Sequence, residues 1–206
     1  MPPQIKNSDI FWSGYDTIEK WRQAMAHDFN HPSRQIAHDL VRGLVSNNPL
    51  NHSFSFAEIG FGQCYDFAHC FKELHDNHRI EYTGFDHTGY FVEYAKIDFP
   101  EYNFRQGDFT DLESGSFDIT YTRHTMQHAA PEVYQDWLRA MLNATRKTAV
   151  IVWRFPPSRE HIVWNDGWNN RWDRDVIHAI IRGRGFSIEE IPVNEEDCIY
   201  VMTRNA

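Results

Sequence analysis

The sequence of 206 residues has little that points to disulfide or metal chemistry. Its three cysteines, Cys64, Cys70 and Cys198, are an odd number and include no Cys-x-x-Cys pair. Such a pattern excludes a disulfide framework and a zinc knuckle, so we expect buried free thiols. Although the chain has 12 histidines, no two of them form a convincing ligand pair beside an acid. We expect no metal.

Long apolar runs and an excess of basic residues are lacking as well. No segment approaches the about 18 apolar residues that a membrane span needs, and no basic segment followed by an apolar stretch opens the chain. We therefore expect a soluble, cytoplasmic protein without a membrane partner. Lysine and arginine number 20 against 29 acids, a net charge of -9. This balance disfavours a broad surface for nucleic-acid phosphates, so we expect no nucleic-acid partner.

Aromatic residues, in contrast, are plentiful, at 15% of the chain with seven tryptophans. They either fill a core or line pockets for flat ligands. The length suits one domain with a substantial core. We divide it into an N-terminal helical extension or lid over residues 1–53 and a main part over residues 54–206.

Strand and helix patterns alternate along the main part. The expected strands are 54–59, 80–85, 102–106, 117–122, 149–153, 186–193 and 198–203, and the expected helices are 16–29, a helix from Pro32, 63–74, 89–97, 131–145 and 174–184. Regular alternation predicts an α/β fold, a doubly wound, mostly parallel sheet of seven strands with helices on both faces. Only residues 194–197 join the last two strands, which is too short for a parallel crossover. The last strand is therefore expected to be antiparallel.

A glycine turn follows the first expected strand, in the stretch FSFAEIGFGQCYDF from Phe54. The apolar run ends in an acid, Glu58, and then in Gly60 and Gly62. Glycines let the backbone bend tightly and come close to a ligand that a Cβ would push away. The turn indicates a nucleotide-like ligand, although glycines at this spacing also occur in ordinary turns.

Five crossover strands followed by a closing hairpin resemble the class I methyltransferases, which use S-adenosylmethionine. In that family the first strand ends in an acid and a glycine-rich turn that holds the methionine part of the cofactor. Glu58, Gly60 and Gly62 of EIGFGQC match this element, and Cys64 stands where a third glycine is common. The resemblance is carried mainly by residues 54–130.

The end of the second strand, EYTGFD, carries the next match. By the resemblance, Asp86 accepts hydrogen bonds from both ribose hydroxyls, and one carboxylate can bind two vicinal hydroxyls in this way. His87 is expected to line the adenine side. The plainer alternative is that Asp86 caps the following helix.

Two further segments complete the resemblance. In QGDF, Asp108 takes the adenine amino group and the backbone amide of Phe109 meets the adenine ring, although Gly-Asp is also a common turn. At the end of the fourth strand, Thr122 and Arg123 carry carbonyl groups that can receive the cofactor's amino group. The implied cofactor is S-adenosylmethionine, with S-adenosylhomocysteine as the product.

Two other classes of protein compete with this interpretation. A dinucleotide-dependent oxidoreductase also uses a glycine turn, but its G-x-G-x-x-G pattern would place glycine where this chain has Tyr65. The acidic setting of Glu58 suits a positively charged sulfonium better than phosphates. A non-catalytic regulator that keeps the cofactor pocket is the other alternative.

The reaction implied is methyl transfer to a small molecule by in-line displacement, in which the protein mainly orients the reactants. If the acceptor is a hydroxyl or a protonated amine, a base would help, and His124 and His128 follow the fourth strand, where the acceptor should lie. His124 is the stronger candidate. The acceptor and the methylated atom stay open.

A tryptophan-rich connection after the fifth strand is the expected substrate region. Its candidate residues are Trp153, Arg154, His161, Trp164 and Trp168, and Tyr15 belongs to an N-terminal piece that we expect to fold over the site as a lid. These side chains suit a wall for a planar or anionic acceptor. Packing onto the first helices, or a dimer surface, is the alternative. Both a monomer and a homodimer stay open.

Overall fold

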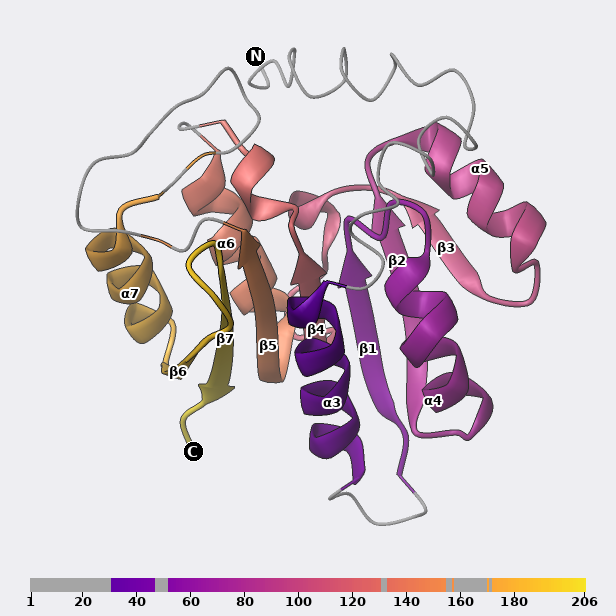
Figure 1. Ribbon diagram of the computed structural model, residues 1–206, viewed down its shortest axis with the longest axis horizontal. Helices are drawn as coiled ribbons and strands as arrows, with labels where there is room; N and C mark the ends of the chain where they lie inside the picture. Colours follow the sequence, from indigo (N-terminus) through magenta and orange to yellow (C-terminus); the bar gives the residue numbers. More distant parts are fainter. Residues whose placement is uncertain (1–30, 47–51, 131–132, 155–156, 158–169, 171) are drawn as a thin grey trace.

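The computed structural model describes residues 31–46, 52–130, 133–154, 157, 170 and 172–206 (Figure 1). Its centre is a seven-stranded sheet in the order β3-β2-β1-β4-β5-β7-β6. The strands are β1 (Phe54–Ile59), β2 (Ile80–Asp86), β3 (Asn103–Gln106), β4 (Phe117–Arg123), β5 (Thr145–Arg154), β6 (Phe186–Pro192) and β7 (Asp197–Arg204). Only β7 is antiparallel to its neighbours, and it lies between β5 and β6.

Helices pack on both faces of this sheet (Figure 1). One face is covered by α3 (Pro32–Ser46), α4 (Lys72–Asp76) and α5 (Gly89–Asp98), and the other by α6 (Tyr134–Ala144) and α7 (Arg174–Gly183). A π-helical turn, η2 (Phe67–Phe71), leads into α4, and single 3-10 turns follow β3 and β4 as η3 (Phe109–Asp111) and η4 (Met126–His128). None of the helices in these ranges is long and apolar enough to cross a membrane.

The alternation of side chains along β5 divides the core into two layers. Val150 and Val152 belong to the cluster under α3, α4 and α5, whereas Ala149, Ile151 and Trp153 belong to the cluster under α6 and α7. Successive side chains of a strand point to opposite faces, so an unbroken apolar run fits a strand that is covered on both sides. The run 149–153 therefore lies in the middle of the fold.

The expected fold class, strand order along the chain and closing hairpin are confirmed. Among the boundaries that differ, two have a clear physical cause. The helix expected from Gln63 begins only at Tyr65, because Cys64 has a left-handed backbone, with φ of 59°. Strand β5 begins at Thr145, four residues before its apolar run, since Thr145 already pairs with Phe117.

The segment assigned to the N-terminal extension contributes directly to the core. Ala37, Val41 and Val45 of α3 are fully buried against the sheet. The helix expected over 16–29 lies outside the described residues, and the division at residue 53 stays a prediction. Because α3 leads into β1, its first residues lie near the edge where the parallel strands end (Figure 1).

Candidate active site

The glycine turn between β1 and η2 has an unusual backbone at three alternate positions. Gly60, Gly62 and Cys64 have φ angles of 75°, 51° and 59°. These lie in the left-handed region that glycine adopts without steric cost. Cys64 is 3% exposed and takes this conformation with a side chain, so the position where the family commonly has glycine requires a glycine-like backbone here as well.

Glu58, at the end of β1, is buried behind this turn. The hydroxyl of Tyr82 donates a hydrogen bond to Glu58 Oε2 at 2.5 Å. Burial, together with the neighbouring carboxylate of Asp66, raises the pKa of Glu58 well above its ordinary value. Glu58 thus faces the interior and is held by β2.

Asp86 joins the end of β2 to the glycine turn. Its Oδ2 accepts a hydrogen bond from the Gly62 amide and its Oδ1 one from the Thr88 amide, both at 2.9 Å. The hydrogen bond from Thr88, the residue before α5, is the local contact expected of a helix cap. The hydrogen bond from Gly62 is not explained by capping, because Gly62 belongs to the glycine turn. An ionised carboxylate has about four acceptor sites, so Asp86 retains capacity for a ligand. Burial raises its pKa. His87 Nδ1 lies 3.7 Å from Asp86 Oδ1.

In the segment after β3, Asp108 caps the short turn η3, which is the common Gly-Asp turn given above as the alternative. Asp108 Oδ1 accepts hydrogen bonds from the amide and the hydroxyl of Thr110, both at 2.6 Å. The Phe109 ring is 1% exposed and stacks on Trp137, with ring centroids 5.0 Å apart. The roles predicted for the Asp108 carboxylate and the Phe109 amide toward adenine stay predictions.

The residues at the end of β4 have distinct surroundings. The hydroxyl of Thr122 donates to the carbonyl of Ile59 at 2.8 Å, which ties β4 to the end of β1. Arg123 is 8% exposed.

His124 has φ of 50°, its amide donates to the Val152 carbonyl, and its Nε2 lies 3.1 Å from Asp197 Oδ1. Bulky residues with positive φ are uncommon and concentrate at functional sites. His128 ends the turn η4.

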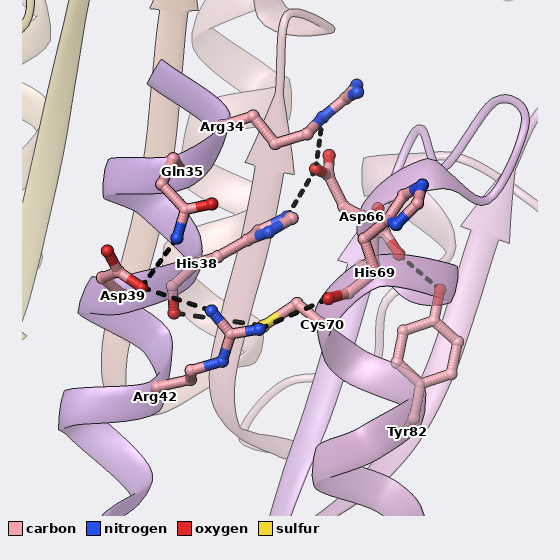
Figure 2. A network of polar contacts seen from close by, with 10 residues as sticks. Arg34, Gln35, His38, Asp39, Arg42, Asp66, His69, Cys70 and Tyr82 are labelled. Carbon is pink, nitrogen blue, oxygen red and sulfur yellow. Dashed lines mark hydrogen bonds and ion pairs between the residues drawn. The ribbon is translucent and has the colours of Figure 1, made fainter. Parts of the chain in front are cut away.

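Sequence reasoning missed a buried polar network between α3 and the helical segment that follows the glycine turn (Figure 2). Asp66 Oδ1 accepts hydrogen bonds from Arg34 Nε at 2.9 Å and from His38 Nε2 at 2.8 Å, and the three side chains are at most 8% exposed. Burial opposes ionisation of Asp66, but the His38 hydrogen bond and the charges of Arg123 and Arg34 hold its pKa far below its ordinary value.

A second missed cluster lies at the same edge of the sheet. The Asp197 carboxylate, 1% exposed, contacts His124 through Oδ1 and His31 through Oδ2, the latter at 3.0 Å. His31, Arg34 and His38 stand at i, i+3 and i+7, so they share one side of α3 and its N-terminal flank. That spacing was the available signal for both clusters. Within the described ranges, no group of three histidine, cysteine or acidic residues could hold a metal ion.

Two polar side chains near the turn are buried without a hydrogen-bond partner among the described residues. Gln63, 6% exposed, has both amide atoms unpaired, and the Tyr121 hydroxyl is unpaired as well. Buried polar atoms are seldom left in this state, because each costs free energy. An amide that offers both donors and an acceptor beside the turn fits a ligand with polar groups of both kinds, such as the amino-acid end of S-adenosylmethionine.

The residues predicted for the substrate are only partly described. Trp153 is fully buried in the core and meets Tyr200 edge to face, with ring centroids 5.9 Å apart. Arg154 Nη2 lies 3.9 Å from Glu196 Oε2 on the edge of the sheet. Tyr15, His161, Trp164 and Trp168 lie outside the described residues. Substrate contact stays a prediction for all of them.

Comparison with known proteins agrees with this geometry. A family model described as a methyltransferase domain matches residues 57–152, which include the glycine turn, Asp86 and His124. No curated protein matched the sequence.

Several solved structures share the fold at low sequence identity. Magnesium protoporphyrin IX methyltransferase from Synechocystis PCC 6803, with bound SAM, has a TM-score of 0.69 and 15% identity over 100% of both chains. The 1,6-didemethyltoxoflavin-N1-methyltransferase of Burkholderia thailandensis, with bound S-adenosylhomocysteine, has a TM-score of 0.68 and 13% identity over 98% of this chain and 88% of that one.

The chain spans about half the length of two other similar structures. It covers 54% of the CurJ carbon methyltransferase and 52% of the citrinin polyketide synthase CMeT domain, in each case with 84% of its own length and 13% identity, at TM-scores of 0.65 and 0.68. The sheet order, the glycine turn and the matched family model agree. Residues 57–152 therefore match the methyltransferase domain family, and the sheet has the fold of the class I methyltransferases.

Proposed function

We propose that this protein transfers a methyl group from S-adenosylmethionine to a small-molecule acceptor at the carboxyl edge of its sheet. The observation that carries the proposal is Asp86, whose carboxylate spans from the end of β2 to the amide of Gly62 in the glycine turn. Ligands of open α/β sheets bind at this edge. Two of the similar methyltransferases, described as bound to SAM or S-adenosylhomocysteine, support the choice of donor.

The chain's own residues would hold the donor from several strands. The turn Glu58 to Cys64 takes the methionine part, with Gln63 as a polar contact, and Asp86 takes the ribose. The remaining cofactor contacts are those predicted from the sequence: His87, Asp108 and the Phe109 amide on the adenine side, and the Thr122 and Arg123 carbonyls toward the amino group. S-adenosylmethionine supplies an electrophilic methyl carbon on a positively charged sulfur, so the protein's task is orientation for in-line displacement.

His124 is the proposed base for an acceptor that loses a proton, such as a hydroxyl or a protonated amine. Its strained backbone, at φ of 50°, is anchored to β5 through Val152, and its ring is anchored to Asp197. A base held in this way is ready to take a proton without rearrangement. His128 lies one short turn further along the chain and is the second candidate.

The acceptor is a matter for experiment, because this fold serves different acceptors. One similar structure is described as a carbon methyltransferase and another as an N1-methyltransferase. Fold alone therefore does not name the acceptor. Trp153, Arg154, His161, Trp164, Trp168 and Tyr15 remain the proposed substrate residues of this chain.

The proposal is tested by incubating the purified protein with methyl-labelled S-adenosylmethionine and a small-molecule extract. We expect label to appear in a small-molecule product, together with S-adenosylhomocysteine. Labelled protein or nucleic acid would contradict the small-molecule acceptor. Tight donor binding without transfer would favour the non-catalytic regulator instead.

Asp86 provides the sharpest test of the donor site. We expect Asp86→Asn to weaken S-adenosylhomocysteine binding by about tenfold or more, because hydrogen bonds to a charged group contribute about 1.5–3 kcal/mol. Isothermal titration calorimetry measures the change. Glu81→Gln, an exposed acid on the same strand, is the matched control and should leave the affinity unaltered. Equal affinities of the Asp86 variant and the parent protein would remove the ribose assignment.

A further inference from the structure

The turn η4 after β4 is joined by hydrogen bonds to two residues that lie far along the chain. Asn170 donates its backbone amide to the Gln127 carbonyl at 3.1 Å and its side-chain Nδ2 to the Ala129 carbonyl at 3.0 Å. The indole Nε1 of Trp172 donates to the Met126 carbonyl, also at 3.1 Å. Asn170 and Trp172 are therefore fixed against the turn.

This junction lies at the edge of the sheet where the acceptor is proposed to bind. The turn η4 follows the carboxyl end of β4, and ligands of open α/β sheets bind at that edge. His124, the proposed base, is two residues before Met126. The Trp172 ring stacks on Tyr134 of α6, with centroids 4.1 Å apart and planes 7° apart. The junction is thus held between the turn and α6.

Two side-chain amide oxygens of the junction are buried and have no hydrogen-bond partner among the described residues. They are Asn170 Oδ1 and Gln127 Oε1, in residues that are 0% and 2% exposed. Because Asn170 Nδ2 donates to a carbonyl, the orientation of this amide is set and its oxygen is the unpaired atom. An unpaired buried acceptor costs free energy, and a site built to hydrogen-bond a ligand has such atoms until the ligand binds.

We infer that Asn170 and Gln127 select the methyl acceptor, because their two unpaired oxygens accept hydrogen bonds from N–H or O–H groups that the acceptor carries. This inference rests on the proposed methyl transfer and adds the class of acceptor, a molecule with two hydrogen-bond donors. An acceptor whose polar groups are only oxyanions, such as carboxylate or phosphate, would leave both oxygens unpaired. The planar or anionic acceptor expected from the sequence is thereby narrowed to one that donates.

The substitution Gln127→Met separates this role from a structural one. Methionine has a similar length and removes the unpaired oxygen. If the oxygen serves only a ligand, the variant should unfold at the same urea concentration as the parent protein or at a higher one, because a buried unpaired acceptor is lost. A structural role, with the oxygen paired in the free protein, predicts a lower midpoint. That result overturns the inference.

Gln35→Met is the matched control. Gln35 is an exposed glutamine of α3 whose Nε2 donates to Asp39 Oδ1 at the surface. Its substitution should leave both the urea midpoint and the kinetics of methyl transfer as they are in the parent protein. Both variants should bind S-adenosylhomocysteine with the parent affinity, since neither residue is among the proposed donor contacts.

The closing experiment is the labelled-methyl assay with the acceptor that it isolates from the small-molecule extract. It is repeated with analogues in which one N–H or O–H donor at a time, other than the methylated group, is replaced by C–H. We expect two such analogues to lose about tenfold or more in kcat/KM with the parent protein. In Gln127→Met, the acceptor itself should lose a similar factor, and one of the two analogue penalties should disappear.

Equal kcat/KM values for the acceptor and all of its analogues in the parent protein overturn the inference, even if Gln127→Met does not fold. Persistence of both penalties in Gln127→Met overturns it as well. The two proposals fail separately. Absence of donor binding or of methyl transfer by the parent protein contradicts the proposed function, whereas the urea midpoint of Gln127→Met is measured without donor or acceptor.

Discussion

We expect Asp66→Asn to lower the free energy of unfolding by about 3–5 kcal/mol, the range for removing one partner of a buried ion pair. Asp66 is the carboxylate shared by Arg34 and His38 (Figure 2). All three side chains are nearly inaccessible to solvent. Without the charge of Asp66, Arg34 and His38 lose the buried carboxylate that both of them contact. Urea unfolding at neutral pH measures the loss.

The control for this substitution is Asp39, an acid of α3 that also pairs with an arginine but at the protein surface. Asp39 pairs with Arg42 at 3.2 Å, but its side chain is 63% exposed. Asp39→Asn should therefore change the free energy of unfolding by less than about 1 kcal/mol. Similar losses for the two variants would contradict the role given to burial.

The same carboxylate gives the protein a defined response to acid. Because the folded-state pKa of Asp66 is depressed, its contribution to stability is complete above the ordinary pKa of aspartate and is lost as pH falls toward the folded value. The difference in stability between the parent protein and Asp66→Asn should narrow as pH falls below about 4. A difference independent of pH would show that the charge is not responsible.

Gly60→Ala is expected to cost about 2–5 kcal/mol. A Cβ at this position would lie 2.3 Å from Thr125 Oγ1 and 2.6 Å from Thr125 Cγ2, and φ is 75°. Overpacking costs about 1–3 kcal/mol, and a left-handed residue that is not glycine costs about 1–2 kcal/mol more. The close contact joins the turn after β1 to the loop after β4, so donor binding should weaken as well.

Gly115 provides a control that separates the steric cost of the new Cβ from the backbone cost of a positive φ. Its φ is 65°, but a Cβ there would meet nothing within 4 Å. Gly115→Ala should therefore show only the backbone cost of about 1–2 kcal/mol. Adding Thr125→Ala to Gly60→Ala should recover part of the lost stability. If the two glycine variants are equally stable in thermal unfolding, contact with Thr125 does not explain the glycine.

Most of the fold could be predicted from the sequence, because its evidence is local. Apolar runs mark the strands, and the residues between β6 and β7 are too few for a crossover, which makes β7 antiparallel. Thr145 shows where this reasoning ends. Its pairing with Phe117 shows that β5 begins before its apolar run, and its hydroxyl bonds to the Met141 carbonyl and contacts the Thr120 hydroxyl at 2.7 Å.

The polar clusters at the site could not be predicted in the same way, because their partners are distant in sequence. His38 and Asp66 are 28 residues apart, and His124 and Asp197 are 73 apart. A motif read along the chain identifies the glycine turn, Asp86 and His124 one by one. It does not identify which carboxylate contacts which imidazole, since these contacts depend on how α3 and the closing hairpin pack against the rest of the fold.

The most direct test of the central claim is isothermal titration calorimetry of the unmodified protein with S-adenosylmethionine, S-adenosylhomocysteine and NAD. The account predicts saturable binding of the first two, with one site per chain, and no binding of NAD. Binding of NAD alone, or of none of the three, would contradict the assignment of the glycine turn and Asp86 to a methyl donor.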